Sequence, residues 1–492
     1  MSEPDKSGGP PGKRPAGLQG DLTEGPIFRT LIIFSVPTLL SNALQSLNGT
    51  VNAIWVGRLI GENALAATTN ANIIMFLLVS AAFGFGMAGT IRIGQRFGAK
   101  DIDGARRTLG SAVGFCFLIT LAIAVIGWFA TPALLTLLGT PGEAYDLALS
   151  YLRMIFISMP LVMVSIIVQM GLRGAGDART PLIFMMLTVA LDVVLNPFFI
   201  TGYGPFPELG ITGSALSMVI AAAISFVSMI AYIYYKDLPL RLRGAELAYL
   251  KPVISELRYI VTKGLPMGAQ MMLMSAAGLI VITLVNAEGE LVTAAYGAAM
   301  QVFTYIQMPA MAIGGAVSAM AAQYIGAKKW DRLDELTRAG MIVNFAMTGA
   351  LTILLLLFDE PVFRLFFERG SEAIPVARHI QLLAAWNFVF FGVTMVMSGT
   401  MRAGGAVWIP LVIIAVTLYP VRLGFYLLTY DWLGQDAIWL SFPVAAFSSI
   451  GLGWWFYYHS GWKARAMAEV ADEAARQAQT DGDPAGRANP SL

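Results

Sequence analysis

The chain has 492 residues, of which 57% are hydrophobic and only 13% are charged, and its mean hydropathy is +0.67. This composition excludes a water-soluble protein of several domains and indicates a membrane protein. Cys116 is the only cysteine, which excludes an intrachain disulfide and a cysteine-based metal cluster. We expect no metal, no organic cofactor and no nucleic-acid partner.

The predicted elements begin after a polar leader. Residues 1–25 are rich in Gly, Pro and charge and lack the apolar core of a signal peptide, so we expect a disordered cytoplasmic tail. Windows apolar and long enough to span a bilayer as helices follow. Their centres lie near residues 42, 82, 122, 158, 191, 223, 275, 307, 350, 387, 419 and 448. The chain is therefore predicted to be an all-α membrane protein with twelve transmembrane helices.

An internal repeat divides these helices into two sets of six. Gln95, Gly98 and Lys100 recur 228 residues later as Gln323, Gly326 and Lys328, and a shift of 229 carries Arg173 onto Arg402 and Pro181 onto Pro410. An even number of spans per copy makes the repeat parallel, which is typical of two-lobed carriers with a site between the lobes. We predict a first lobe of residues 26–236, a cytoplasmic linker of 237–255, a second lobe of 256–460 and a polar cytoplasmic tail of 461–492.

Basic residues gather in alternate connections between the predicted spans. They lie between the second and third spans, in the linker between the copies and after the eighth span, as in Arg92, Arg106, Lys251 and Lys328. By the positive-inside rule these connections are cytoplasmic. We therefore expect a multi-pass protein of the plasma (cell inner) membrane with both termini in the cytoplasm.

Asp192 is the one carboxylate that the sequence places well inside a span. Thr188, Asp192 and Asn196 are spaced i, i+4, i+8, so hydroxyl, carboxyl and amide share one helical face. Pro197 follows and frees a backbone carbonyl one turn back. A carboxylate at this depth usually faces a wet cavity and binds an ion or a proton. The alternative is a neutral carboxyl that only holds helices together.

The first span carries a polar stripe on one broad face, formed by Asn42, Gln45, Asn48 and Asn52. Such amides either hydrogen-bond neighbouring helices or surround a carboxyl or a polar substrate. Asn52 is assigned to the coupling site, and the other three to substrate binding. Asn70, at the start of the second span, could close the same pocket.

The second copy lacks an acid in the spans near 275 and 387, so we expect any ion coupling in the first lobe. Its polar, methionine and aromatic side chains suit varied apolar or cationic ligands, although packing is the simpler role for any one of them. The candidate substrate-binding residues are Gln270, Met274, Gln301, Phe303, Met308 and Asn387. Arg422, inside the eleventh span, is interpreted as structural.

Four segments together resemble one transporter family. They are LRGAGDARTP (Leu172–Pro181), LNPFFITGYGPFPELGITGSA (Leu195–Ala215), MQVFTYIQMPAMAIGGAVSAMAAQYIGAK (Met300–Lys328) and SGTMRAGGA (Ser398–Ala406). In order and spacing the chain resembles a multidrug and toxic compound extrusion (MATE) transporter from about Phe28 to His459. The resemblance implies twelve helices in two lobes, a cavity between them, rocking between outward-open and inward-open states, and export driven by H⁺ or Na⁺.

The chain departs from that family at three places. Asn52 stands where members often carry an acid, and Asp192 and Asn196 reverse the usual order of amide and acid before the proline. The carboxyl thus lies one turn earlier, about 6 Å along the helix. The acids that one branch carries in helices seven and ten have no counterpart here, so H⁺ is expected as the coupling ion rather than Na⁺.

The sequence therefore predicts a monomeric secondary transporter embedded in membrane lipid. We expect it to export amphiphilic, cationic small molecules by H⁺ antiport, with Asp192 as the coupling carboxylate. No phosphate-binding loop and no assembled nucleophile and base were found, so the chain is not expected to be an ATP-driven pump or an enzyme. Two alternatives stay open: a flippase for lipid-linked precursors, which predicts a basic cavity, and a gradient-independent metabolite facilitator.

Overall fold

The computed structural model describes residues 22–137, 142–203, 208–368 and 370–482, and within these ranges the regular structure is helical. The N-lobe consists of α1 (Ile27–Leu59), α2 (Glu62–Gly98), α3 (Ile102–Leu137), α4 (Gly142–Gly174), α5 (Arg179–Thr201) and α6 (Gly210–Tyr235). A short 3₁₀ helix, η1 (Gly244–Leu250), joins it to the C-lobe. The C-lobe consists of α7 (Ile254–Ala287), α8 (Glu290–Gly326), α9 (Trp330–Leu357), α10 (Asp359–Phe363), α11 (Ala373–Ala384), α12 (Trp386–Ala403), α13 (Trp408–Val416), η2 (Thr417–Val421), α14 (Arg422–Leu433) and α15 (Asp436–His459), and α16 (Trp462–Gly482) ends the described chain.

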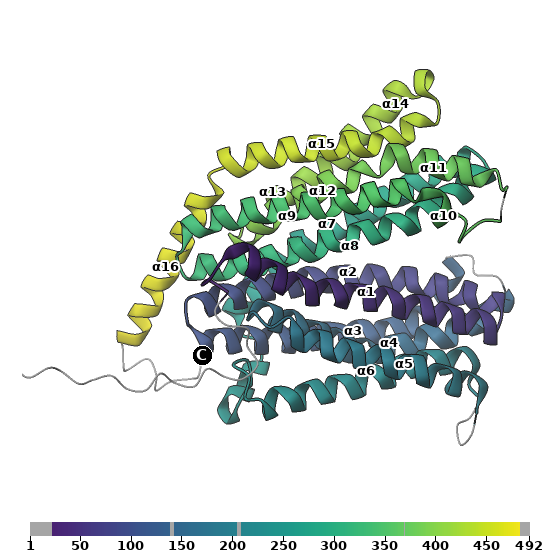
Figure 1. Ribbon diagram of the computed structural model, residues 1–492. Helices are drawn as coiled ribbons and strands as arrows, with labels where there is room; N and C mark the ends of the chain where they lie inside the picture. Colours follow the sequence, from purple (N-terminus) through teal and green to yellow (C-terminus); the bar gives the residue numbers. More distant parts are fainter. Residues whose placement is uncertain (1–21, 138–141, 204–207, 369, 483–492) are drawn as a thin grey trace, which may run out of the picture.

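The predicted spans correspond to these helices. Within the described residues, eleven helical segments are long and apolar enough to cross a membrane, and the 37-residue helix α2 supplies the twelfth. The tenth span consists of α11 and α12, and the eleventh of α13, η2 and α14. The two lobes lie side by side with their helices nearly parallel (Figure 1). The predicted all-α, two-lobed fold is therefore confirmed.

The eleventh span is interrupted by a π-helical turn. Pro420 lies inside this turn, Thr417–Val421, where its missing N–H cannot complete a normal α-helical hydrogen bond. Such turns are frequent at functional sites, because they redirect the side chains that follow. Arg422 comes directly after the turn and is buried.

The lobes meet along α1 and α2 of the N-lobe and α7 and α8 of the C-lobe (Figure 1). At one end the contact is reciprocal. Gln95 Nε2 donates to the Ala403 carbonyl at 2.8 Å, and Gln323 Nε2 donates to the Gly174 carbonyl at 3.0 Å. Because Gln95 and Gln323 are repeat-equivalent, each lobe donates the same bond to the other. We call these two bonds the glutamine latch.

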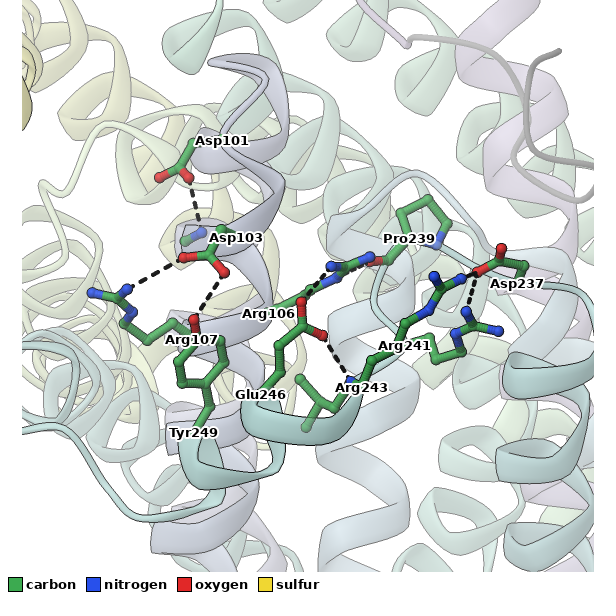
Figure 2. A network of polar contacts seen from close by, with 12 residues as sticks. Asp101, Asp103, Arg106, Arg107, Asp237, Pro239, Arg241, Arg243, Glu246 and Tyr249 are labelled. Carbon is green, nitrogen blue, oxygen red and sulfur yellow. Dashed lines mark hydrogen bonds and ion pairs between the residues drawn. The ribbon is translucent and has the colours of Figure 1, made fainter. Parts of the chain in front are cut away.

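The connection between the lobes packs on the N-lobe rather than hanging free (Figure 2). Arg106 of α3 donates to the Pro239 carbonyl and pairs with Glu246, both at 2.7 Å, and Tyr249 donates to Asp103 at 2.9 Å. Glu256, at the start of α7, is buried. It pairs with Arg92 and Arg96 of α2 and accepts a hydrogen bond from Thr108 of α3. We call the end of the bundle that carries this connection the linker end.

Both described chain ends lie at the linker end. Leu22 and Thr23 are buried, and Lys329 Nζ donates to Thr23 Oγ1 at 2.9 Å, so residues 22–25 are packed and not part of a disordered tail. Residues 1–21 lie outside the described residues, as do 483–492. Trp462 of α16 is buried, and Lys463 pairs with Asp334 at 2.7 Å, which holds α16 against the C-lobe.

Candidate functional site

Asp192 lies in a buried polar cluster inside the N-lobe. Three helices contribute to the cluster: α1 with Asn48 and Asn52, α5 with Asp192 and Asn196, and α6 with Ser214 and Ser217. Each helix contributes two residues three or four positions apart, which places both on one face. We call these six residues the N-lobe polar cluster.

The carboxyl itself has two polar partners. Ser217 Oγ donates to Asp192 Oδ1, and the Asn48 side chain is a further hydrogen-bond partner. Only 1% of Asp192 is exposed, so the carboxyl is shielded from bulk solvent. A carboxylate here is costly unless it is hydrogen-bonded or protonated, and the contacts with Ser217 and Asn48 supply hydrogen bonds to it.

The second half of the cluster is held by amides. Asn196 Nδ2 and Ser214 Oγ both donate to Asn52 Oδ1, at 2.7 and 2.6 Å. Asn196 Oδ1 is buried and accepts no hydrogen bond from the described residues. Asn196 lies one helical turn from Asp192, so this unpaired acceptor is close to the carboxyl. A water molecule or another hydrogen-bond donor would satisfy it.

The structure thus brings Asp192 and Asn196 of α5 together with Asn48 and Asn52 of α1. Helical spacing predicted the shared face within each helix but not the contact between the two helices. Thr188 is half-buried and donates to the Phe184 carbonyl of its own helix at 2.9 Å, an ordinary helix contact. Sequence reasoning missed the two serines of α6. The sequence does carry a signal for them, because the hydroxyls of Ser214 and Ser217 in the segment GSALS are spaced i, i+3 and share one helical face. The signal is weak, since serines are common where membrane helices pack together.

A separate cavity of about 130 Å³ lies between the lobes, lined by α1, α2 and α4 on one side and by α7, α8, α12 and α13 on the other. Three predicted substrate residues line it: Asn42, Gln270 and Met274. Seven of its lining residues are methionines: Met87, Met170, Met267, Met271, Met274, Met311 and Met395. Arg173 and Arg402 line it too, which sequence reasoning did not foresee.

A second cavity, of about 180 Å³, lies inside the C-lobe and shares Met274 and Ile414 with the first. It is lined by two more predicted residues, Phe303 and Asn387, and by Arg422. The Arg422 guanidinium stacks on the Phe442 ring, 3.6 Å from its centroid, and its Nε donates to Ser441 Oγ at 3.4 Å, so its structural role stays a prediction.

The remaining predicted substrate residues do not line these two cavities. Gln45 and Gln301 are exposed, and Met308 is half-buried. The side chain of Asn70 lies outside what the structure describes. Helical periodicity alone could not distinguish these residues from those that line a cavity, because Gln45 lies on the same helix as Asn42, and Gln301 and Met308 lie on the same helix as Phe303.

Two repeated lobes of membrane-spanning helices, with a cavity between them, define a two-lobed integral membrane protein of the transporter type. The MatE family model matches residues 37–198 and 266–428, one match in each lobe. The chain therefore belongs to the MatE family.

Two relatives from Bacillus subtilis (strain 168) illustrate the likeness. The "Probable multidrug resistance protein YoeA" is 35% identical over 446 residues, covering 90% of this chain and 96% of the relative. The "Probable multidrug resistance protein YpnP" is 29% identical over 448 residues, covering 91% and 98%. A solved outward-facing multidrug resistance MATE family transporter of the MOP superfamily has a TM-score of 0.82 at 21% identity, covering 93% of this chain and 99% of that one. That likeness confirms the fold.

Proposed function

We propose that the protein is a multidrug efflux transporter that exports amphiphilic small molecules in exchange for H⁺, with Asp192 as the coupling carboxylate. The names of the two Bacillus relatives support a role in multidrug resistance, and efflux is the mechanism that we propose for it. The observation that carries the coupling is the burial of Asp192 inside a span, among hydrogen-bonding groups from two other helices. The protein works as a monomer in the plasma membrane, with its linker end and both termini in the cytoplasm.

Helix α1 connects the coupling carboxyl to the substrate cavity. Its Asn48 contacts Asp192, and its Phe34, Thr38 and Asn42 line the cavity between the lobes. Protonation removes the charge of Asp192 and changes what Asn48 and Ser217 can donate to. The preferred position of α1 then changes, and α1 also packs against α8 of the opposite lobe. Protonation and substrate thus bias the same two-state rocking motion.

The direction of transport follows from which state each ligand prefers. H⁺ binds Asp192 in the outward-open state and favours release of substrate there. The protonated protein, free of substrate, turns inward and H⁺ leaves toward the cytoplasm. The ionised carboxyl then lets the pocket load substrate, and the loaded protein turns outward. Exchange requires that H⁺ and substrate stabilise opposite states, because a ligand with equal affinity for both states shifts nothing.

The test is substrate efflux driven by a pH gradient in proteoliposomes. Asp192→Asn keeps the size and a hydrogen-bonding side chain but cannot ionise, so we expect it to abolish H⁺-driven efflux while the variant stays folded. Asp146→Asn, which alters an exposed acid on α4 of the same lobe, is the matched control. Undiminished H⁺-driven efflux by Asp192→Asn would reject the assignment. Collapsing the H⁺ and Na⁺ gradients separately tests our preference for H⁺.

Two other functions stay as alternatives. A flippase for lipid-linked precursors is favoured by the arginines that line the cavity between the lobes, since such head groups are anionic. A gradient-independent facilitator would exchange substrate by counterflow with both ion gradients collapsed. The sequence favours cationic substrates, whereas the arginines that line the cavity between the lobes favour anionic ones.

A further inference from the structure

The cavity between the lobes is lined by two cations. Arg173 lies in the last turn of α4 and Arg402 in the last turn of α12, at repeat-equivalent positions. Each lobe thus contributes one guanidinium to the same cavity. Among the described lining residues there is no Asp or Glu to balance them.

The donors of these guanidiniums are largely unused. Arg173 has no hydrogen bond and no ion pair with any described residue, and its buried Nε lacks an acceptor. Arg402 makes one hydrogen bond, from a terminal nitrogen to Gln270 Oε1 at 3.2 Å, and its buried Nε is also without an acceptor. The Gln270 amide is itself fixed, because its Nε2 donates to the Val407 carbonyl at 3.3 Å. Gln270 therefore orients Arg402 without neutralising it.

The acid nearest to Arg173 in sequence is engaged elsewhere. Asp177, in the turn between α4 and α5, accepts hydrogen bonds from the backbone N–H groups of Arg179 and Thr180, both at 3.0 Å, and from the Thr180 hydroxyl. It therefore satisfies backbone donors in the first turn of α5. Guanidinium donors that are buried without an acceptor are costly, and a planar guanidinium fork is the group that best matches a carboxylate or a phosphate.

We propose that Arg173 and Arg402 bind the anionic group of the transported molecule, a carboxylate or a phosphate carried on an apolar body that lies against the methionines of the cavity. Adaptable thioether walls accept varied apolar bodies, while the two guanidiniums require the negative head. This assignment rests on the proposed function in one respect, namely that the cavity between the lobes is the substrate site. The head can belong to a soluble amphiphile or to a lipid, and both sources share this chemistry.

The sign of the substrate charge changes how transport responds to voltage. Exchange of one H⁺ for a monovalent cation moves no net charge. Exchange of one H⁺ inward for a monovalent anion outward moves two positive charges inward, so an inside-negative potential drives it. Export of anions is therefore expected to accelerate under such a potential, whereas export of cations by the same exchange would not.

The direct test is binding to the purified full-length protein. Three probes share a pyrene ring and a four-carbon chain: pyrenebutyrate is anionic, pyrenebutanol neutral and pyrenebutylamine cationic. We expect pyrenebutyrate to bind at least about tenfold more tightly than the other two, because a charge-assisted hydrogen bond is worth about a factor of ten or more. Arg402→Gln and Arg173→Gln are each expected to remove about tenfold of that affinity, and the corresponding Lys variants to keep most of it.

The matched control is Arg153→Gln, on the same helix as Arg173. Arg153 stacks on the Trp128 ring, 5.0 Å from its centroid, and lines neither cavity, so its loss is expected to leave pyrenebutyrate affinity unchanged. Gel filtration and thermal unfolding check that each variant is folded. If the Gln variants fail to fold, the comparison of the three probes on the unmodified protein still tests whether the cavity prefers an anion. Equal affinity for the three probes, preference for the amine, or folded Gln variants with unchanged affinity would each overturn the proposal.

Two further experiments are needed. The first distinguishes a lipid from a soluble amphiphile as the source of the anionic head, and the second separates the arginine site from the coupling role of Asp192. Displacement of pyrenebutyrate by lysophosphatidic acid in detergent, together with lipid translocation in vesicles, assigns the site to a lipid head. Displacement by soluble aromatic carboxylates, with their export from vesicles, assigns it to a soluble amphiphile. Asp192→Asn is expected to keep the preference for the anion. Anion preference without H⁺-driven efflux would therefore reject the coupling role of Asp192 and leave the arginine site standing.

Discussion

The glutamine latch makes a quantitative prediction about how the lobes separate. Replacing Gln95 or Gln323 by Ala removes one of the two reciprocal bonds at the linker end, which measure 2.8 and 3.0 Å. A hydrogen bond of this kind has a net worth of about 1 kcal/mol. Each single variant should therefore raise the population that is open at the linker end about fivefold, and the double variant about thirtyfold, since about 1.4 kcal/mol corresponds to a factor of ten.

The assay is alkylation of a cysteine introduced behind the latch. Ala322 is fully buried on α8, and its Cβ lies close to Gly94 of α2, so the thiol introduced by Ala322→Cys can react only when the lobes separate. We call this thiol the reporter cysteine. Cys116 is the chain's only native cysteine, and Cys116→Ser removes the background. When opening is fast relative to labelling, the rate of N-ethylmaleimide reaction follows the open population.

Gln301→Ala serves as the control for the latch variants. Gln301 lies on α8 like Gln323, but it is exposed and lines neither cavity, so its loss should leave the labelling rate of the reporter cysteine unchanged. Equal labelling rates in the protein with an intact latch and in the double latch variant would refute the reasoning. In that case the two bonds would not contribute to holding the lobes together.

Two other changes test the packing at the linker end. Gly326→Ala should also accelerate labelling of the reporter cysteine, because the added Cβ would overlap the Gln95 carbonyl oxygen, whereas Gly297→Ala on the same helix meets nothing within 4 Å and should have no effect. Glu256→Gln should destabilise the protein by about 2 kcal/mol, measured as thermal unfolding in detergent, because Arg92 and Arg96 lose their charge-assisted contacts with Glu256 while Arg96 keeps its pair with Asp101. Glu246→Gln breaks a partly exposed pair with Arg106 and should cost at most about 1 kcal/mol; equal losses for the two variants would contradict this ranking.

The part of the site that repeats along one helix could be predicted from the sequence. Asp192 with Asn196, and Asn48 with Asn52, are each four residues apart, so helical geometry fixes that they share a face. The bond between Asn52 and Asn196 could not be predicted in the same way, because it depends on the register between α1 and α5. That register is set by packing along the whole length of both helices, and no local pattern encodes it.

The two arginines that line the cavity between the lobes show a second limit of prediction from sequence. The recurrence of Arg173 as Arg402 is visible in the sequence, where it indicates the repeat but not a shared cavity. An arginine near the end of a span can snorkel to water, pair with an acid or face a cavity, and sequence alone does not distinguish these. The structure adds what the sequence lacks: in both copies the arginine directly precedes a residue whose carbonyl accepts a latch bond from the other lobe.

This adjacency links the substrate site to the latch. Arg173 precedes Gly174, and Arg402 precedes Ala403, so each guanidinium belongs to the same short segment as one latch acceptor. Two cations that line one cavity repel each other, and an anion between them replaces this repulsion by attraction to both lobes. Binding of the anion should therefore stabilise the arrangement in which the latch is closed.

The consequence can be measured with the same reporter cysteine. Saturating pyrenebutyrate should slow its labelling by at least about threefold, which corresponds to differential binding of only about 0.7 kcal/mol between the closed and open arrangements. Pyrenebutanol should not slow it, and Arg402→Gln should remove the effect of pyrenebutyrate while leaving the effect of the latch variants. If pyrenebutyrate binds but labelling is unchanged or faster, the guanidiniums hold the anion without drawing the lobes together.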